Sequence, residues 1–140
     1  MLTRRGFAGF AGCALCAAAG FIATEAAAEG APPAAGGFTR KMLSKTEGPV
    51  AGYVTIVMEV EIDPGALIAR HTHPGIESGY VVEGTIDLPI EGQPTRTLKA
   101  GDAFQVPPRT PHAGTRNGDK KTKVISTYVV EKDKPLASPA

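Results

Sequence analysis

Apolar and polar side chains alternate along the middle of the chain in short segments that end at turn-forming residues. In residues 53–62 the even positions, from Val54 to Ile62, are all apolar, and the odd positions are mostly polar. This period of two is typical of a strand with one buried face. By the same reasoning, Gly, Pro, Asn and Asp turns separate further predicted strands at residues 67–73, 76–82, 85–90, 95–99, 103–106, 112–115 and 123–131.

The spacing of these segments predicts the class of fold. No segment repeats apolar residues at helical spacing for more than a turn or two. Many short strands at near-regular intervals are typical of an all-β sandwich or barrel. The 17 Gly and 12 Pro residues fit such a turn-rich chain.

The first 28 residues have the composition of a secretory signal peptide. Arg4 and Arg5 precede an uncharged run over residues 6–24, and three alanines at 26–28 offer a cleavage site. Residues 3–7 (TRRGF) also resemble the twin-arginine export motif. We therefore expect a periplasmic or secreted protein with no stable membrane span after processing.

Two other readings of this segment stay open, and its cysteines restrict the chemistry of the rest. The run would be a short, weakly apolar anchor helix if it were retained, and residues 10–13 loosely resemble a lipoprotein signal. Cys13 and Cys16 both lie inside the segment, so a processed chain contains no thiol. Metal binding there would depend on imidazole and carboxylate groups.

The remaining chain divides into a folded region and two end segments that have little to bury. Residues 29–37 are a Pro/Gly/Ala linker, and residues 133–140 resemble a frayed tail, so we place the domain at residues 38–132. A domain of about 95 residues has a limited core, which favours a homodimer. The 15 basic and 14 acidic residues nearly cancel and form no basic stripe, so we expect a small-molecule ligand and no nucleic acid.

Three histidines and one glutamate are the candidate metal ligands. His71 and His73 are two apart on a predicted strand, so they share a face with Cα atoms roughly 6.6 Å apart. Glu77 follows the next turn, and His112 follows a proline-rich segment. Imidazole and carboxylate ligands suit Mn, Fe, Ni, Cu or Zn better than Ca or Mg. The alternative for each residue alone is an ordinary surface or hydrogen-bonded side chain.

These residues carry a resemblance to a known family. The pattern Gly65-x5-His71-x-His73-x3-Glu77-x6-Gly84 resembles the first cupin motif, and Gly101-x5-Pro107 followed by His112 resembles the second. The second departs from the usual pattern, because Arg109 stands where glycine is common and Arg116 where asparagine is expected. The three glycines also end strands, where a positive φ is expected.

The resemblance implies a double-stranded β-helix (a cupin or jelly-roll barrel) with one divalent metal ion held by His71, His73, Glu77 and His112. Within that family, the chain resembles small single-domain cupins of the quercetin-dioxygenase type. That family includes dioxygenases, oxalate oxidases, lyases and sugar isomerases. We expect a metal-dependent enzyme with dioxygenase-like chemistry on a small oxygen-rich substrate, with Mn or Fe as the favoured metal. A non-catalytic binding or sensing module and a lyase or isomerase remain alternatives.

The pocket around this site is harder to predict from sequence. Candidate lining residues are Phe104, Val106, Val81 and Ile125, although an apolar strand residue is core by default. Spare acid–base groups near the motifs are few, namely Tyr80, Glu83, Gln105 and Thr110. Three arginines lie beside the candidate ligands in sequence and could bind an anionic substrate: Arg70, Arg109 and Arg116. The ordinary alternative for each is an exposed charged side chain.

Overall fold

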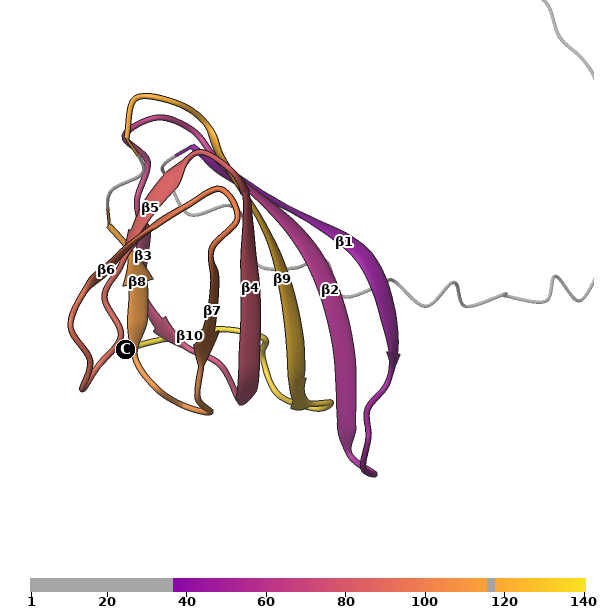
Figure 1. The fold of residues 1–140 in the computed structure, drawn as a ribbon. Helices are drawn as coiled ribbons and strands as arrows, with labels where there is room; N and C mark the ends of the chain where they lie inside the picture. Colours follow the sequence, from indigo (N-terminus) through magenta and orange to yellow (C-terminus); the bar gives the residue numbers. More distant parts are fainter. Residues whose placement is uncertain (1–36, 116–117) are drawn as a thin grey trace, which may run out of the picture. The chain divides into compact units, whose positions relative to one another are not determined.

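The computed structural model describes residues 37–115 and 118–140, and this part of the chain consists of strands and turns. Figure 1 shows one large antiparallel sheet beside two smaller ones. The large sheet has the strand order β1–β2–β9–β4–β7, with bounds β1 Phe38–Glu47, β2 Tyr53–Ile62, β9 Thr122–Glu131, β4 Gly75–Glu83 and β7 Ala103–Val106. The predicted signal peptide (1–28) and nearly all of the predicted linker (29–37) lie outside the described residues.

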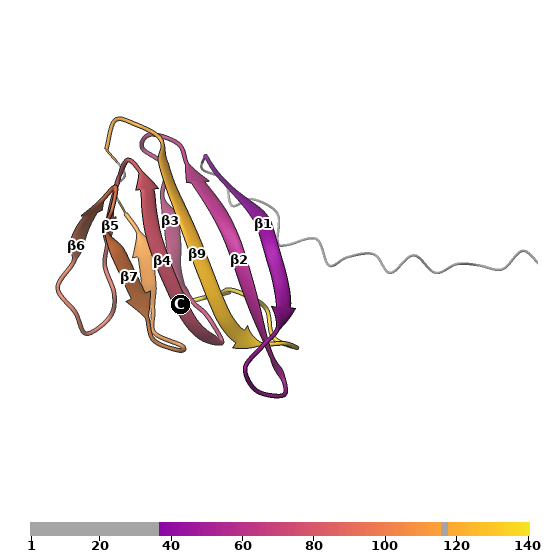
Figure 2. The same ribbon diagram turned by 45° about the vertical axis from the view of Figure 1, so that its right-hand side comes forward.

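The smaller sheets form the opposite layer, as Figures 1 and 2 show. One has the order β10–β3–β8, with β10 Ser138–Pro139, β3 Ile68–Thr72 and β8 His112–Gly114. The other is the hairpin of β5 Thr85–Leu88 and β6 Arg96–Lys99. Two facing antiparallel layers are the predicted double-stranded β-helix, so the predicted fold class is confirmed. Among residues 37–115 and 118–140, no helix has the length and apolar character needed to cross a membrane.

The alternating pattern that predicted β2 also explains how the layers pack. Val54, Ile56, Val60 and Ile62 are buried, and their odd-numbered neighbours are only half-buried. β9 alternates in the same way and pairs with β2 along its whole length. Burying one apolar face of each strand is worth about 1.5–3 kcal/mol per large side chain, which drives the two layers together.

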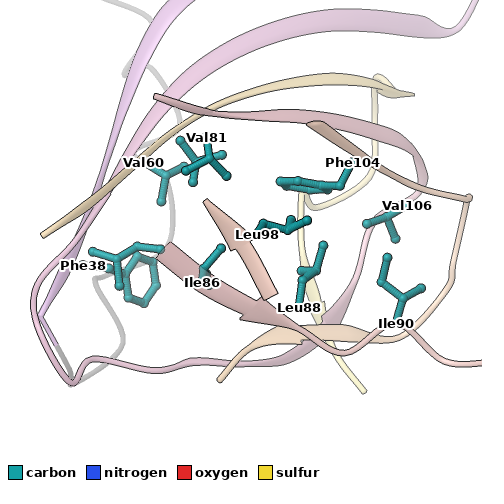
Figure 3. Packing of buried hydrophobic residues seen from close by; sticks show 11 residues of the cluster. Phe38, Val60, Val81, Ile86, Leu88, Ile90, Leu98, Phe104 and Val106 are labelled. Carbon is teal, nitrogen blue, oxygen red and sulfur yellow. The ribbon is translucent and has the colours of Figure 1, made fainter. Parts of the chain in front are cut away.

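Two apolar clusters fill the space between the layers. The larger one, shown in Figure 3, draws on both layers and contains Phe38, Val60, Ile62, Val81, Ile86, Leu88, Ile90, Leu98, Phe104, Val106 and Val124. The smaller one lies at the other end of β2 and β9 and contains Val54, Ile56, Tyr128 and Val130. The predicted metal ligand Glu77 and its neighbour Ser126 are buried polar residues of the same sheet.

Three glycines were predicted to have positive φ, and all three do. The φ angles are +75° at Gly65, +80° at Gly84 and +95° at Gly101. Arg109 adopts the same left-handed conformation, with φ +56°, although it has a Cβ atom. The position where the cupin motif commonly has glycine therefore keeps the glycine backbone but carries an arginine.

The two ends of the folded region differ from the sequence-based expectation. The pattern predicted no strand before residue 53, yet β1 pairs with β2 from Phe38 to Glu47. Residues 133–140 were expected to be a frayed tail, whereas Ser138 and Pro139 pair with β3. Leu136 also packs against the smaller cluster. Both segments are held by pairing with a strand that is distant in sequence, which local composition does not reveal.

Candidate metal centre

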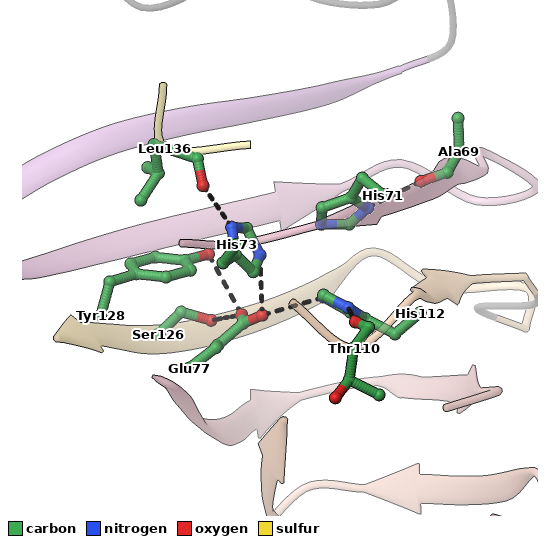
Figure 4. A network of polar contacts seen from close by, with 9 residues as sticks. All are labelled: Ala69, His71, His73, Glu77, Thr110, His112, Ser126, Tyr128 and Leu136. Atoms are coloured by element: carbon green, nitrogen blue, oxygen red, sulfur yellow. Dashed lines mark hydrogen bonds and ion pairs between the residues drawn. The ribbon is translucent and has the colours of Figure 1, made fainter. Parts of the chain in front are cut away.

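Three strands bring the predicted ligands to one place between the layers. His71 lies on β3 directly opposite His112 on β8, and His73 follows at the end of β3. Glu77 enters from β4 in the large sheet, as Figure 4 shows. The structure therefore brings together all four predicted residues, and they come from both layers.

The geometry of the group is compact. The ring centroids of the three imidazoles are 4.3–5.1 Å apart, and one nitrogen from each ring lies within 4.8 Å of the others. Glu77 Oε2 is 3.1 Å from both His73 Nε2 and His112 Nε2. His73, His112 and Glu77 are buried, while His71 is half-buried. One side of the cluster is thus closed by protein and the other lies nearer to solvent.

Each histidine uses Nδ1 to hydrogen-bond a main-chain carbonyl. His71 donates to Ala69 O (2.7 Å), and His112 donates to Thr110 O (3.0 Å). His73 donates to Leu136 O in the C-terminal segment (2.5 Å). A carbonyl oxygen only accepts, so Nδ1 must carry the proton in all three rings. In a neutral ring Nε2 then carries the lone pair, and at His112 this nitrogen lies 3.1 Å from Glu77 Oε2.

Glu77 is held as a carboxylate by hydroxyl groups and by the histidines. Ser126 Oγ donates to Glu77 Oε1 at 2.8 Å and Tyr128 Oη donates to the same oxygen at 3.1 Å. Burial alone would raise the pKa of Glu77, but the neighbouring side chains of His112, His73 and Ser126 outweigh it, so the pKa is lowered. Burial and the nearby Glu77 charge raise the pKa of Tyr128, which keeps its proton.

The pKa of His71 moves in the direction that favours metal binding. Burial lowers this pKa from 6.5 to about 4, and the charges of His112 and His73 add to the decrease. His71 is therefore a neutral imidazole at physiological pH, the form in which histidine binds metals.

The residues present fit a metal ion. In the part of the chain that the structure describes, His73 Nε2 is buried without a hydrogen-bond partner, although Glu77 Oε2 lies 3.1 Å away. A lone pair that faces a carboxylate is unfavourable unless a proton or a cation lies between them. One nitrogen of each ring lies within 4.8 Å of the others, beside the Glu77 carboxylate, so the three histidines are positioned to bind a metal ion. Nitrogen ligands indicate a transition metal.

A cavity opens beside this cluster, between the two layers. It has about 490 Å³ of space, counting the solvent at its open mouth. Apart from the cluster itself and its hydroxyl partners, the lining is mainly apolar: Val60, Ile62, Ile68, Ile86, Leu88, Phe104, Ala113, Gly114 and Val124, with Arg40 in addition. The site therefore faces a space for a small and largely apolar molecule.

The predictions about this pocket are correct only in part. Phe104 lines the cavity, whereas Val81 and Val106 are buried in the larger apolar cluster. The prediction for Ile125 is wrong, because β9 buries its even-numbered positions and turns Ile125 to the other face. The correct neighbour is Val124, and a one-residue shift in a strand always exchanges the two faces.

The candidate polar residues of the pocket lie elsewhere. Tyr80, Glu83 and Gln105 are exposed, and Thr110 contributes its main-chain carbonyl to His112. Two of the candidate arginines are engaged by carboxylates, Arg70 by Glu91 and Arg109 by Glu131. Arg116 lies outside the described residues.

Sequence reasoning did not identify the residues that surround Glu77. Ser126 and Tyr128 occupy the same face of β9 as Val124 and Val130. Two hydroxyl groups on the apolar face of a strand are a usable signal, because a buried hydroxyl needs a partner. Leu136 could not be identified in this way, because its main-chain oxygen, and not its side chain, accepts the hydrogen bond from His73.

Comparison with known proteins agrees with the geometry. The profile of the family described as Cupin domain matches residues 58–128. The chain is 35% identical over 74 residues to germin-like protein 5-1 of Oryza sativa subsp. japonica, in an alignment that covers 49% of this chain and 34% of the relative. The chain thus spans about a third of the length of that relative.

Solved structures share the fold. An RmlC-like cupin from Shewanella frigidimarina NCIMB 400 is 28% identical with a TM-score of 0.59, covering 70% of this chain and 80% of the other. KdgF from Halomonas sp. is 28% identical with a TM-score of 0.56, covering 69% and 84%. DMSP lyase DddQ from Ruegeria pomeroyi DSS-3 is 21% identical with a TM-score of 0.62, covering 74% and 51%, which supports the fold alone. With the family profile over half of its length and a histidine cluster where the motifs predict one, this chain belongs to the cupin family.

Proposed function

We propose that the chain is a metal-dependent enzyme in which His71, His73, Glu77 and His112 hold one divalent transition metal ion. The observation that carries this proposal is the convergence of Nε2 atoms whose rings are protonated at Nδ1. Such a site also contains the carboxylate of Glu77, whose pKa is lowered. Together these groups form a site with one negative charge and several nitrogen lone pairs, which binds a divalent cation better than a proton.

The chain's own residues prepare the site for this role. Ser126 and Tyr128 fix one oxygen of Glu77, which leaves the other directed at the histidines. The apolar lining lowers the local dielectric and so strengthens every charge interaction at the cluster. When bound, a divalent ion would supply Lewis-acid chemistry, and Mn or Fe would add one-electron chemistry with dioxygen.

The shortage of acid–base groups at the cavity favours dioxygenase-like chemistry over a lyase or isomerase reaction. A lyase or isomerase reaction needs a protein base that removes a proton from carbon. Among the residues that line the cavity, the two hydroxyl groups are hydrogen-bonded to Glu77, and the remaining polar groups are Arg40 and the candidate ligands. Oxygen insertion into a substrate that already binds as an anion requires no such base.

The same shortage supports a second function, a non-catalytic module that binds a small ligand. Such a module would use the cavity and the cation for affinity alone. The two functions differ in one measurable property, since a binding module consumes no dioxygen when its ligand is present.

The cellular setting follows from the N-terminal sequence. We propose export to the periplasm or to the outside of the cell, on the basis of the twin-arginine-like segment. A site of this kind binds Cu and Zn more tightly than Mn or Fe by the general affinity order. A barrel that folds before export would enclose Mn or Fe in the cytoplasm, which is why we favour these two. The homodimer also remains a prediction.

Metal analysis tests the site directly. We expect about one transition metal ion per chain in protein purified from its native compartment, and a large loss in His71→Ala and Glu77→Gln. Glu83→Gln is the matched control, because Glu83 lies on the same strand as Glu77 but is exposed. Similar metal content in the wild type and the three variants would refute the metal site. Stoichiometric copper or zinc would refute the preference for Mn or Fe.

Oxygen uptake then separates the two functions. The metal-loaded protein is mixed with a panel of catechols and enolisable diketones in an oxygen electrode. Uptake that depends on both the substrate and Glu77 supports the dioxygenase. Binding of a panel member without oxygen uptake supports the module that only binds.

A further inference from the structure

One arginine at the cavity is a candidate ligand-binding residue that the sequence motifs do not include. In the register of β1 and β2, Phe38 lies opposite Ile62 and Arg40 lies opposite Val60. Opposite residues of antiparallel strands point to the same face, and Val60 and Ile62 line the cavity. Arg40 therefore projects toward the cavity from β1, and it is itself one of the lining residues.

A neighbouring ring holds this arginine in place. The guanidinium carbon of Arg40 lies 5.0 Å from the centroid of the Phe38 ring, two residues earlier on the same face of β1. A cation over a phenyl ring at this distance is attracted by the ring electrons. Stacking of this kind fixes the plane of the guanidinium while its N–H groups remain available as donors.

The charge of Arg40 has no counterion in the part of the chain that the structure describes. Arg70 and Arg109, the other candidates for an anion, are neutralised by Glu91 and Glu131. Arg40 has no such hydrogen bond or ion pair among residues 37–115 and 118–140. Arg40 is itself exposed, and at this cavity its guanidinium provides a fork of donors that matches a carboxylate.

We propose that Arg40 binds the carboxylate of a small ligand whose apolar body occupies the cavity. This inference rests on the proposed function, because it names the class of molecule that the site would take. A second oxygen group at the other end of the ligand would face the histidine cluster, which lines the same cavity. The small oxygen-rich substrate expected from the family thus becomes a carboxylate with an apolar middle.

The test compares two probes of equal shape and different charge, hexanoate and hexanamide. Both are titrated by calorimetry into wild-type protein, with and without Zn²⁺, and into Arg40→Gln and Arg40→Lys. Arg96→Gln is the matched control, because Arg96 is an exposed arginine on β6, outside the cavity lining, whose side chain donates to the main-chain carbonyl of Ala103. We expect Arg40→Gln to weaken hexanoate about tenfold and to leave hexanamide unchanged, as loss of a charge-assisted hydrogen bond predicts.

The outcomes separate this inference from the metal site. Arg40→Lys should retain part of the affinity for hexanoate, and the difference between the probes should persist without Zn²⁺, because Arg40 is not a ligand of the ion. Equal binding of the two probes by wild type, no binding of hexanoate, or equal effects of Arg40→Gln and Arg96→Gln would each overturn the proposal. Zn²⁺ content is measured on the same samples, so a failed metal site is recognised independently.

Discussion

Removal of residues 135–140 is expected to weaken metal binding while the fold is retained. The main-chain oxygen of Leu136 accepts the hydrogen bond from His73 Nδ1, and it is the partner that fixes the proton on that nitrogen. Without it, the His73 ring is free to turn or to carry its proton on Nε2, which is the atom that faces Glu77. Either change removes a prepared nitrogen from the site.

The size of the effect follows from the contacts that are lost. Loss of the outer hydrogen-bond partner of a metal-binding histidine typically costs 10- to 100-fold in affinity, or about 1.4–2.7 kcal/mol. The segment also contributes the packing of Leu136 against the cluster around Tyr128 and the short pairing of β10 with β3. These contacts are partly exposed, so we expect a loss of about 1–2 kcal/mol in the free energy of unfolding.

The assay is chelator competition for Zn²⁺ and Mn²⁺, together with urea unfolding of the metal-free protein. Leu98→Ala is the informative control, because Leu98 is only 1% exposed and its truncation should cost about 2–5 kcal/mol without touching His73. Leu67→Ala removes an exposed leucine and should change neither quantity. An affinity within about twofold of wild type after truncation, or an equal loss in Leu98→Ala, would show that the hydrogen bond to Leu136 does not prepare the site.

Three further predictions concern titration, backbone conformation and packing. The pKa of His71 is about 4 in the folded chain against 6.5 when unfolded, so its contribution to stability is complete above pH 6.5 and is lost as the pH falls toward 4. Urea unfolding of metal-free protein should show a decrease of about 2 kcal/mol across this range after allowance for partial exposure, and a constant value would contradict it. Arg109→Gly should be about 1 kcal/mol more stable than Arg109→Ala, because only glycine adopts φ +56° without strain; chemical denaturation that ranks alanine first would show that no strain exists. Gly79→Ala should cost about 1–3 kcal/mol, since the new Cβ would lie 2.1 Å from Phe104 Cζ, and an unchanged melting temperature would exclude the close approach.

The strands of the barrel's middle were predictable because each carries its own pattern. Residues 53–62 were predicted as a strand and form β2 with the same bounds, since alternate apolar positions face one core. The strand 38–47 was not predictable in this way. Apart from Phe38, every residue of β1 is exposed, so pairing with β2 rather than burial creates the strand. The pairing that creates β1 depends on the sequence of β2 and on the fold, not on the pattern within residues 38–47.

The same distinction applies to the site. The histidines and Glu77 were found because their spacing belongs to a recurrent motif, and the structure brings them together. Leu136 and Arg40 had no local signal. One acts through its main chain, and the other becomes significant only through the strand register that directs it toward the cavity.

The position of β1 at the edge of the sheet has a consequence for how this protein diversifies. β1 precedes residues 58–128, the part that matches the family profile, and among the strands that the structure describes it pairs with β2 alone. Substitutions at residues 38–47 therefore leave the motifs that carry the histidines untouched. If Arg40 selects the ligand as proposed, substitutions in β1 would change which molecule is admitted while the chemistry of the centre stays constant.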